Sequence, residues 1–302
     1  MESFARGWNF LKQAWGMAFE DKDLIKPSIY ALVVGFVVSV IGIIPIVGAG
    51  LLLGNSRIGQ GVTFGLGALM VSVNFTVTYV FSGMTAYLIF GYLSEGDGRM
   101  DKAWAIVRRD FFDILTLAAV STVVNMLKNA SKKRQQRGGL GRFVAGMARS
   151  AVGLLEVLWT EAAFLILPAM VIDDLNLKNA AQRVWNITKQ NLLLIGISAV
   201  GVRAVTGLIG FLLGLTGAVI GFAVGYGIIA LLGAETLGLI LGIGLGAMLF
   251  FAFVLVASVI GSYTGIAYHT CLYIWARDQE KAVAAGQQAQ VLAPQPLAAV
   301  LG

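Results

Sequence analysis

The residues of this chain that could do chemistry are ionisable side chains placed inside long apolar stretches. Glu161 lies in an apolar stretch over residues 150–172, and Arg203 lies in the following one, over 191–214. If such stretches cross a membrane, a lone charge costs several kcal/mol, and an opposite charge offsets much of that cost. We therefore expect Glu161 and Arg203 to pair between two helices.

The spacing along the chain places these two charges at the same depth. Glu161 precedes Asp173 by 12 residues, and Arg203 follows Asn191 by 12 residues. With Asp173 and Asn191 at one membrane surface, a rise of 1.5 Å per residue puts both charges roughly 18 Å below it, near the middle of a layer about 30 Å thick. Such a pair either fixes the register of the helices or belongs to a translocation site.

Other reactive side chains are too few to build a recognisable catalytic or metal centre. His269 is the only histidine and Cys271 the only cysteine, which excludes an internal disulfide and the usual zinc ligand sets. A lone histidine among apolar residues is more often a structural hydrogen-bonding group than a proton relay. The sequence contains no nucleophile elbow, phosphate-binding loop or zinc-protease motif. We expect a protein that is not an enzyme, with no catalytic residues, cofactor or metal.

The composition is that of a membrane protein. The chain is 58% hydrophobic and 13% charged, with a mean hydropathy of +0.81. Soluble domains have roughly 45–50% apolar and about 25% charged residues. Apolar runs suited to membrane-crossing helices occupy residues 28–54, 61–93, 111–127, 150–172, 191–214 and 238–276. We expect an all-α polytopic bundle of about six transmembrane helices.

A short polar motif recurs before these apolar runs. "RGWNFLKQ" at 6–13 precedes the first pair of runs, "WAIVRR" at 104–109 the middle pair, and "RVWNITKQ" at 183–190 the last pair. Each copy has a tryptophan followed four residues later by a base, within a helical apolar pattern. These pairs, which we expect to anchor amphipathic helices at the membrane interface, are Trp8 and Lys12, Trp104 and Arg108, and Trp185 and Lys189.

The repeat divides the chain into one membrane domain, 1–277, of three modules, and a tail. Each module, at about 1–98, 99–172 and 173–277, is an interfacial helix followed by a helical hairpin. Residues 278–302 are rich in Ala, Gln and Pro, and we expect a mobile tail because nothing there could bury a core. The Gly-rich stretch at 215–234 could cross the membrane, re-enter it or extend long helices outward.

The distribution of basic residues predicts the orientation. Residues 1–26 and 94–110 each carry four Lys and Arg, whereas the loop after the first run has only Arg57. The positive-inside rule then predicts a cytoplasmic N-terminus. The basic loop at 128–142 conflicts with three hairpins, because they place it outside. Its central bases are Lys132, Lys133, Arg134 and Arg137.

Three segments together carry a resemblance to a known family. "SFARGWNFLKQAWGMAFEDKDLIKP", "LPAMVIDDLNLKNAAQRVWNITKQN" and "GIAYHTCLYIWA" resemble an uncharacterised prokaryotic multi-pass membrane family, a domain of unknown function. The middle segment is also similar to the membrane domains of some glycerophosphodiester phosphodiesterases. The resemblance implies six spans with cytoplasmic linking helices, and it brings no catalytic residues.

Three functions compete at this point. The first is a self-associating scaffold or accessory protein that interacts with lipid, because glycines at 210, 214, 217, 221 and 225 follow a helix-packing pattern. The alternative is a small-solute transporter or channel that uses the charges near the middle of the membrane. An enzyme acting on lipid has only the phosphodiesterase resemblance behind it. We expect lipid and a second copy of the chain as partners, and no nucleic acid.

Overall fold

The computed structural model describes residues 2–54, 56–134, 159–233, 235–286 and 291–301. Helices and turns make up this described part of the chain, which contains no strand. The helices are α1 (Glu2–Glu20), η1 (Lys22–Leu24), α2 (Lys26–Leu53), α3 (Arg57–Glu95), α4 (Met100–Arg109), α5 (Phe111–Arg134), a helix over 159–173, α7 (Leu177–Leu232), α8 (Thr236–Ala284) and α9 (Gln295–Leu301).

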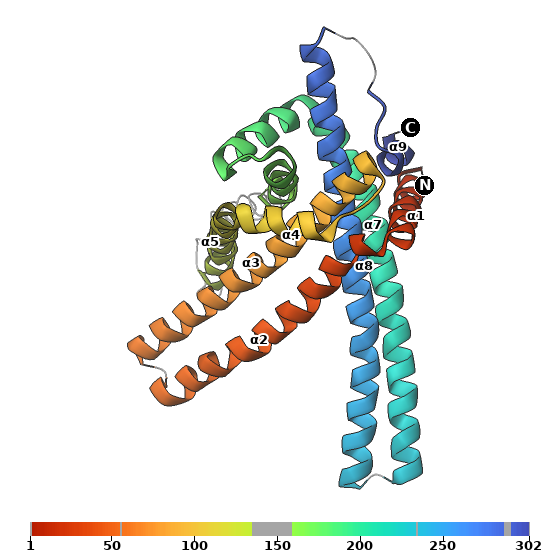
Figure 1. Cartoon of the computed structure of the whole chain (residues 1–302). Coiled ribbons are helices and arrows are strands. Elements are labelled where there is room, and N and C mark those ends of the chain that lie inside the picture. Colours follow the sequence, from red (N-terminus) through yellow and green to blue (C-terminus); the bar gives the residue numbers. More distant parts are fainter. Residues whose placement is uncertain (1, 55, 135–158, 234, 287–290, 302) are drawn as a thin grey trace, which may run out of the picture.

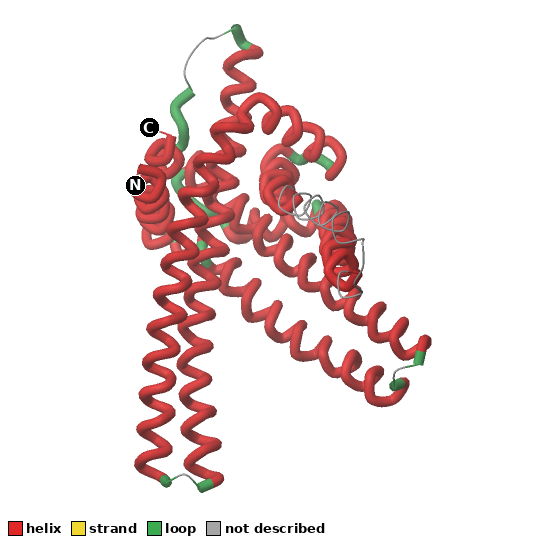
Figure 2. Tube along the Cα trace, turned by 180° about the vertical axis from the view of Figure 1, so that it is seen from behind, coloured by secondary structure: helices red, strands yellow, loops and turns green. Residues whose placement is uncertain are grey.

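Two long antiparallel hairpins dominate the molecule, α2 with α3 and α7 with α8 (Figure 1). They meet near the chain termini and diverge toward their tips, which lie far apart in both views (Figure 2). In the described part of the chain, five helical segments are long and apolar enough to cross a membrane, which is consistent with a multi-pass membrane protein. These segments are Lys22–Leu53, Arg57–Glu95, Phe111–Lys128, Val202–Leu232 and Thr236–Ala284. Of the six expected apolar runs, the one over residues 150–172 begins outside the described residues.

The core lies where the two hairpins converge. There α3, α5, the helix over 159–173 and α8 contribute fully buried side chains, among them Leu88, Leu117, Leu167 and Tyr268. Toward the tips the hairpins expose large apolar side chains instead, such as Phe64 on α3 and Phe222 on α7. We call these distal halves of the hairpins the arms. Lipid is the environment in which such a surface is stable.

Helix α1 docks on α8 through polar contacts as well as apolar ones. The Tyr263 hydroxyl donates to the Ala14 carbonyl at 2.9 Å, and Trp15 Nε1 donates to Thr264 Oγ1 at 3.1 Å. The buried face of α1 carries Phe10 and Ala14, whereas Trp8 points outward with 48% of its surface exposed. Trp8 therefore does not lie on the face of α1 that packs on the core, whereas Trp15 does.

The third expected amphipathic segment, which contains residues 183–190, is not a separate helix. It forms the first turns of α7, which cross the top of the long hairpin and then bend into it without a break (Figure 1). Residues 215–232 continue the same helix and pair with the start of α8, so this stretch extends a long helix and does not re-enter. Glycines allow this close pairing: a Cβ on Gly221 would lie 2.5 Å from the Gly246 carbonyl oxygen.

The C-terminal segment corrects the expectation that nothing in it packs. Helix α8 continues to Ala284, and α9 lies against α1 with Leu297 fully buried and Val300 nearly so. The return of the chain is also anchored, because Trp275 Nε1 donates to the Val291 carbonyl at 3.2 Å. Two apolar residues one helical turn apart suffice for docking once a complementary surface exists, and only the fold supplies that surface.

Candidate functional site

Glu161, Arg203 and His269 form one cluster at the convergence of the hairpins. Arg203 Nη2 forms an ion pair with Glu161 Oε1. The other carboxylate oxygen, Oε2, lies 3.0 Å from His269 Nε2. His269 Nδ1 lies 2.6 Å from the carbonyl oxygen of Gly265, one helical turn earlier on α8. The structure thus brings the two predicted charges together and adds the histidine as a third member.

Packing on either side of each charged residue holds the cluster in place. On α7, Val202 and Val205 are buried, so Arg203 between them turns to the open side and keeps 53% of its side chain exposed. On α8 the His269 ring stacks on Phe164, with ring centroids 5.3 Å apart, and only 8% of its side chain is exposed. The histidine is therefore fixed, whereas the guanidinium has room to move.

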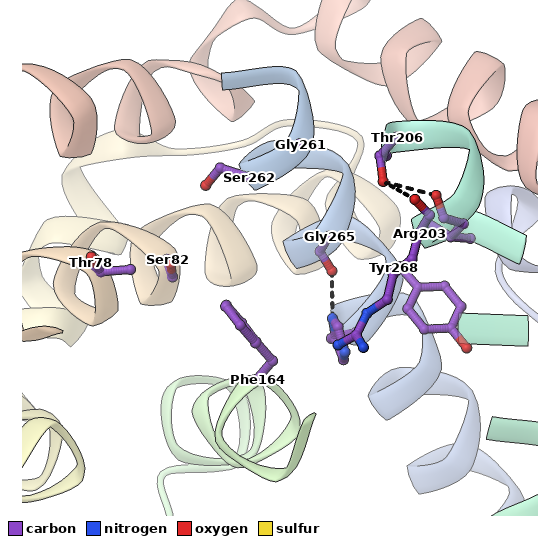
Figure 3. Close-up of a pocket in the computed structure, with 11 residues that line it drawn as sticks. Thr78, Ser82, Phe164, Arg203, Thr206, Gly261, Ser262, Gly265 and Tyr268 are labelled. Atoms are coloured by element: carbon purple, nitrogen blue, oxygen red, sulfur yellow. Dashed lines mark hydrogen bonds between the residues drawn. The ribbon is translucent and has the colours of Figure 1, made fainter. Parts of the chain in front are cut away.

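A cavity of about 190 Å³ adjoins this cluster. Its walls come from α3, the helix over 159–173, α7 and α8 (Figure 3). In that view the Arg203 side chain reaches from α7 toward the turn of α8 that carries Gly265 and Tyr268. The polar groups on the walls are Thr78, Ser82, Arg203, Thr206, Ser262 and His269. One water needs about 10–15 Å³ by the same measure, so several waters or a small solute fit.

Two glycines keep this cavity open on the α8 side. Gly261 and Gly265 both line it, and a Cβ built on either one meets no atom within 4 Å. A larger side chain would therefore enter empty space and would not strain the backbone. These positions offer a direct way to fill the cavity.

A second charged cluster, which was not predicted from the sequence, joins the C-terminal end of the helix over 159–173 to α7 and α8. Asp173 accepts from Arg183 on α7 at 3.0 Å, from Arg277 on α8 at 3.3 Å and from the Tyr273 hydroxyl. Arg183 also pairs with Glu280 at 3.2 Å. The sequence does place Tyr273 and Arg277 one helical turn apart on one face of a helix. Nothing in the neighbouring sequence indicates that their partner is Asp173.

The predicted interfacial anchors lie on the surface. The Arg108 guanidinium lies 4.9 Å from the centre of the Trp104 ring, and Lys189 Nζ lies 4.9 Å from that of Trp185. Among the described residues no such contact joins Trp8 and Lys12. All three tryptophans are substantially exposed, at 48%, 40% and 60% for Trp8, Trp104 and Trp185. Two of the three predicted pairs are thus cation–π contacts.

The basic loop falls largely outside the described residues. Lys132, Lys133 and Arg134 lie in the last turn of α5, where the backbone alone is described, and Arg137 lies in the stretch that is not described. The side of the membrane on which this loop lies therefore stays a prediction. Within the described part of the chain, no group of three His, Cys, Asp or Glu side chains could hold a metal ion.

No protein-family model and no curated protein sequence matches this chain. The fold of the described residues therefore gives the class by itself: it is helical, with five apolar helices of membrane-crossing length, consistent with a multi-pass membrane protein. The resemblance to a membrane family of unknown function stays a proposal.

Proposed function

We propose that this protein is a small-solute transporter that binds its solute in the cavity beside Arg203 and His269. The observation that carries the proposal is the cavity itself, a mostly apolar space with Arg203, His269 and several hydroxyls on its walls, at the point where two apolar hairpins diverge. Transporter sites commonly lie between helical repeats and use buried charges to fix the solute. The proposed setting is a prokaryotic inner membrane, with the N-terminus in the cytoplasm and lipid around the arms.

The size and chemistry of the walls indicate what the cavity binds. A volume near 190 Å³ is below the ~300–1,000 Å³ of pockets for drug-sized ligands, so the solute has only a few heavy atoms. The hydroxyls of Ser82 and Ser262 can donate and accept, whereas Arg203 only donates. The hydroxyls of Thr78 and Thr206 already donate to carbonyls of their own helices, so toward a solute they accept. The proposed role is non-enzymatic and needs no cofactor.

Filling the cavity tests this proposal. Gly261→Leu places a side chain in the cavity, whereas Gly244→Leu, on the same helix and also in open space, places one on the arm. Both changes replace glycine in a helix and raise helix propensity equally, by about 1 kcal/mol. The pair is therefore matched except for the cavity.

The measurement is uptake of formate, acetate, glycerol and choline tracers by proteoliposomes that contain the full chain. We expect uptake of at least one tracer above that of empty liposomes, lost in Gly261→Leu and retained in Gly244→Leu. Equal loss in both variants, or no uptake by the wild-type protein, would contradict transport through this cavity.

A self-associating scaffold is the second candidate, favoured by glycines that the α7–α8 contact does not use. Gly207, Gly210 and Gly214 on α7 face open space, so another helix could approach them closely. Native mass spectrometry of protein released from lipid nanodiscs separates the candidates. A defined oligomer that retains only phospholipid favours the scaffold, and a stoichiometric small solute favours the transporter.

A further inference from the structure

The hydrogen bonds of His269 require one more proton than its neutral ring carries. Both ring nitrogens face oxygens that accept: the Gly265 carbonyl at Nδ1 and the Glu161 carboxylate at Nε2. A neutral imidazole has a single N–H and can satisfy only one of them. Both bonds form together only if the ring is an imidazolium, or if Glu161 is protonated and donates to Nε2.

Both arrangements give the cluster the same charge. With a carboxylate and a neutral imidazole, Glu161 balances Arg203 and the net charge is zero. With one added proton, on either partner, the cluster carries a net charge of +1. The geometry thus links proton binding by Glu161 and His269 to the appearance of a positive charge on the cavity wall.

Other ionisable groups around the cavity do not offset this charge. Among the described residues, those that line the cavity or pair with a lining residue are Arg203 from α7, His269 and Tyr268 from α8, and Glu161 from the helix over 159–173. Helix α3 contributes the hydroxyls of Thr78 and Ser82 to this wall. A single positive charge in a space of low polarity strongly favours one negative charge as its partner.

We propose that the cavity binds a small monovalent anion together with one proton, the proton being held between Glu161 and His269 and the anion by Arg203. This inference rests on the proposed transport function and names its substrate class. Coupled binding lets the pair enter an apolar layer as a neutral unit, because proton and anion cancel. The more than half-exposed Arg203 can turn from Glu161 to the anion once Glu161 is neutralised by the proton.

The test is binding of acetate and formate to the full chain in nanodiscs, measured by calorimetry between about pH 6 and 8.5. Linkage predicts that affinity falls as pH rises, approaching about tenfold per pH unit where the free cluster has lost its proton. Acetate and formate stay fully ionised over this range, so their own titration does not contribute. An affinity that does not change with pH would overturn the proposal.

Glu161→Gln gives the sharpest prediction because it should strengthen binding. The amide leaves Arg203 uncompensated at every pH, so affinity at pH 8.5 rises above that of the wild-type protein and varies less than about twofold with pH. Arg203→Gln should abolish binding throughout. A general loss of structure cannot produce tighter binding, so weaker binding by Glu161→Gln at pH 8.5 would also overturn the proposal.

Should Glu161→Gln fail to fold, His269→Leu replaces it. Leucine can neither take up a proton nor accept one from Glu161, so we expect acetate binding at least tenfold weaker near pH 6. Unchanged binding would overturn the proposal. Glycerol and choline distinguish failure of this inference from failure of the proposed function. If either of them binds, if Gly261→Leu abolishes that binding, and if neither anion binds, the cavity still binds a solute but the anion–proton assignment is wrong. Absence of binding by all four probes removes both.

Discussion

At the scale of single residues, the contact of His269 with Glu161 changes the role that the Glu161–Arg203 ion pair can have. Alone, an arginine and a carboxylate between helices fix register. With a fixed histidine on the other carboxylate oxygen, Glu161 is shared between a mobile cation and a rigid ring. A shared carboxylate can change partners when it takes up a proton, which a simple ion pair cannot do at neutral pH.

A double-mutant cycle measures how strongly the two charges couple. We expect Glu161→Gln and Arg203→Gln each to lower the melting temperature, and the double variant to recover much of the loss, with a coupling energy of about 1–2 kcal/mol. The exposed pair of Arg99 and Asp101 on the surface serves as the control cycle, where solvent screening leaves no measurable coupling. Independent losses at Glu161 and Arg203 would show that the ion pair contributes nothing to stability.

At the scale of elements, the α7–α8 hairpin depends on glycines at its contact line. Gly221 and Gly225 of α7 face Gly246 and Gly242 of α8, and each added Cβ would come within 2.5–2.8 Å of a carbonyl oxygen. Van der Waals contact and close backbone approach hold helices together in lipid, where no hydrophobic effect favours their association. Gly221 and Gly225, two of the glycines that suggested self-association, are thus used inside the chain, whereas Gly210 and Gly214 are not.

Gly221→Ala tests this contact against Gly214→Ala on the same helix. The first change forces the helices apart, and we expect a loss of about 1–3 kcal/mol in unfolding free energy. The second meets no atom within 4 Å, so we expect stability to stay constant or rise by up to about 1 kcal/mol. Thermal melts in one lipid mixture make the comparison. Equal melting temperatures for the two variants would show that the hairpin does not need this contact.

At the scale of the whole molecule, the exposed arms indicate where the bilayer lies. The segment Val202–Leu232 has 31 residues, which at 1.5 Å per residue is roughly 46 Å and exceeds an apolar layer of about 30 Å. Arg203 near the middle of the layer would push exposed apolar residues such as Val219 and Phe222 toward water. We propose instead that lipid surrounds the arms, which would place the charge cluster closer to one membrane surface than the 18 Å counted from the sequence.

Labelling of single cysteines checks both the orientation and this placement. Native Cys271 is buried and stays unlabelled, so it needs no replacement. With a membrane-impermeant maleimide, Ser94→Cys should react from the cytoplasmic side, and Ser56→Cys, near the α2–α3 tip, from the opposite side. Val219→Cys on the α7 arm should react from neither side. Reaction of Ser56→Cys and Ser94→Cys from one side would contradict a membrane-crossing hairpin.

The sequence by itself determined the features that depend on local chemistry. Long apolar runs of helical length predicted an all-α chain, and the structure confirms helices with membrane-crossing length. Equal spacing from polar ends predicted that Glu161 and Arg203 meet, and the structure joins them in an ion pair. Both inferences work because helix rise and apolar transfer follow from residue type and position alone.

Only the tertiary structure decided which distant segments share a surface. The place of His269 beside Glu161, the pairing of Arg277 with Asp173 and the docking of α9 on α1 each join residues more than 100 positions apart, a separation at which helical periodicity gives no information. The cavity likewise arises from four helical segments and belongs to none of them. Such features depend on how closely side chains pack, and that is settled only when the helices are assembled.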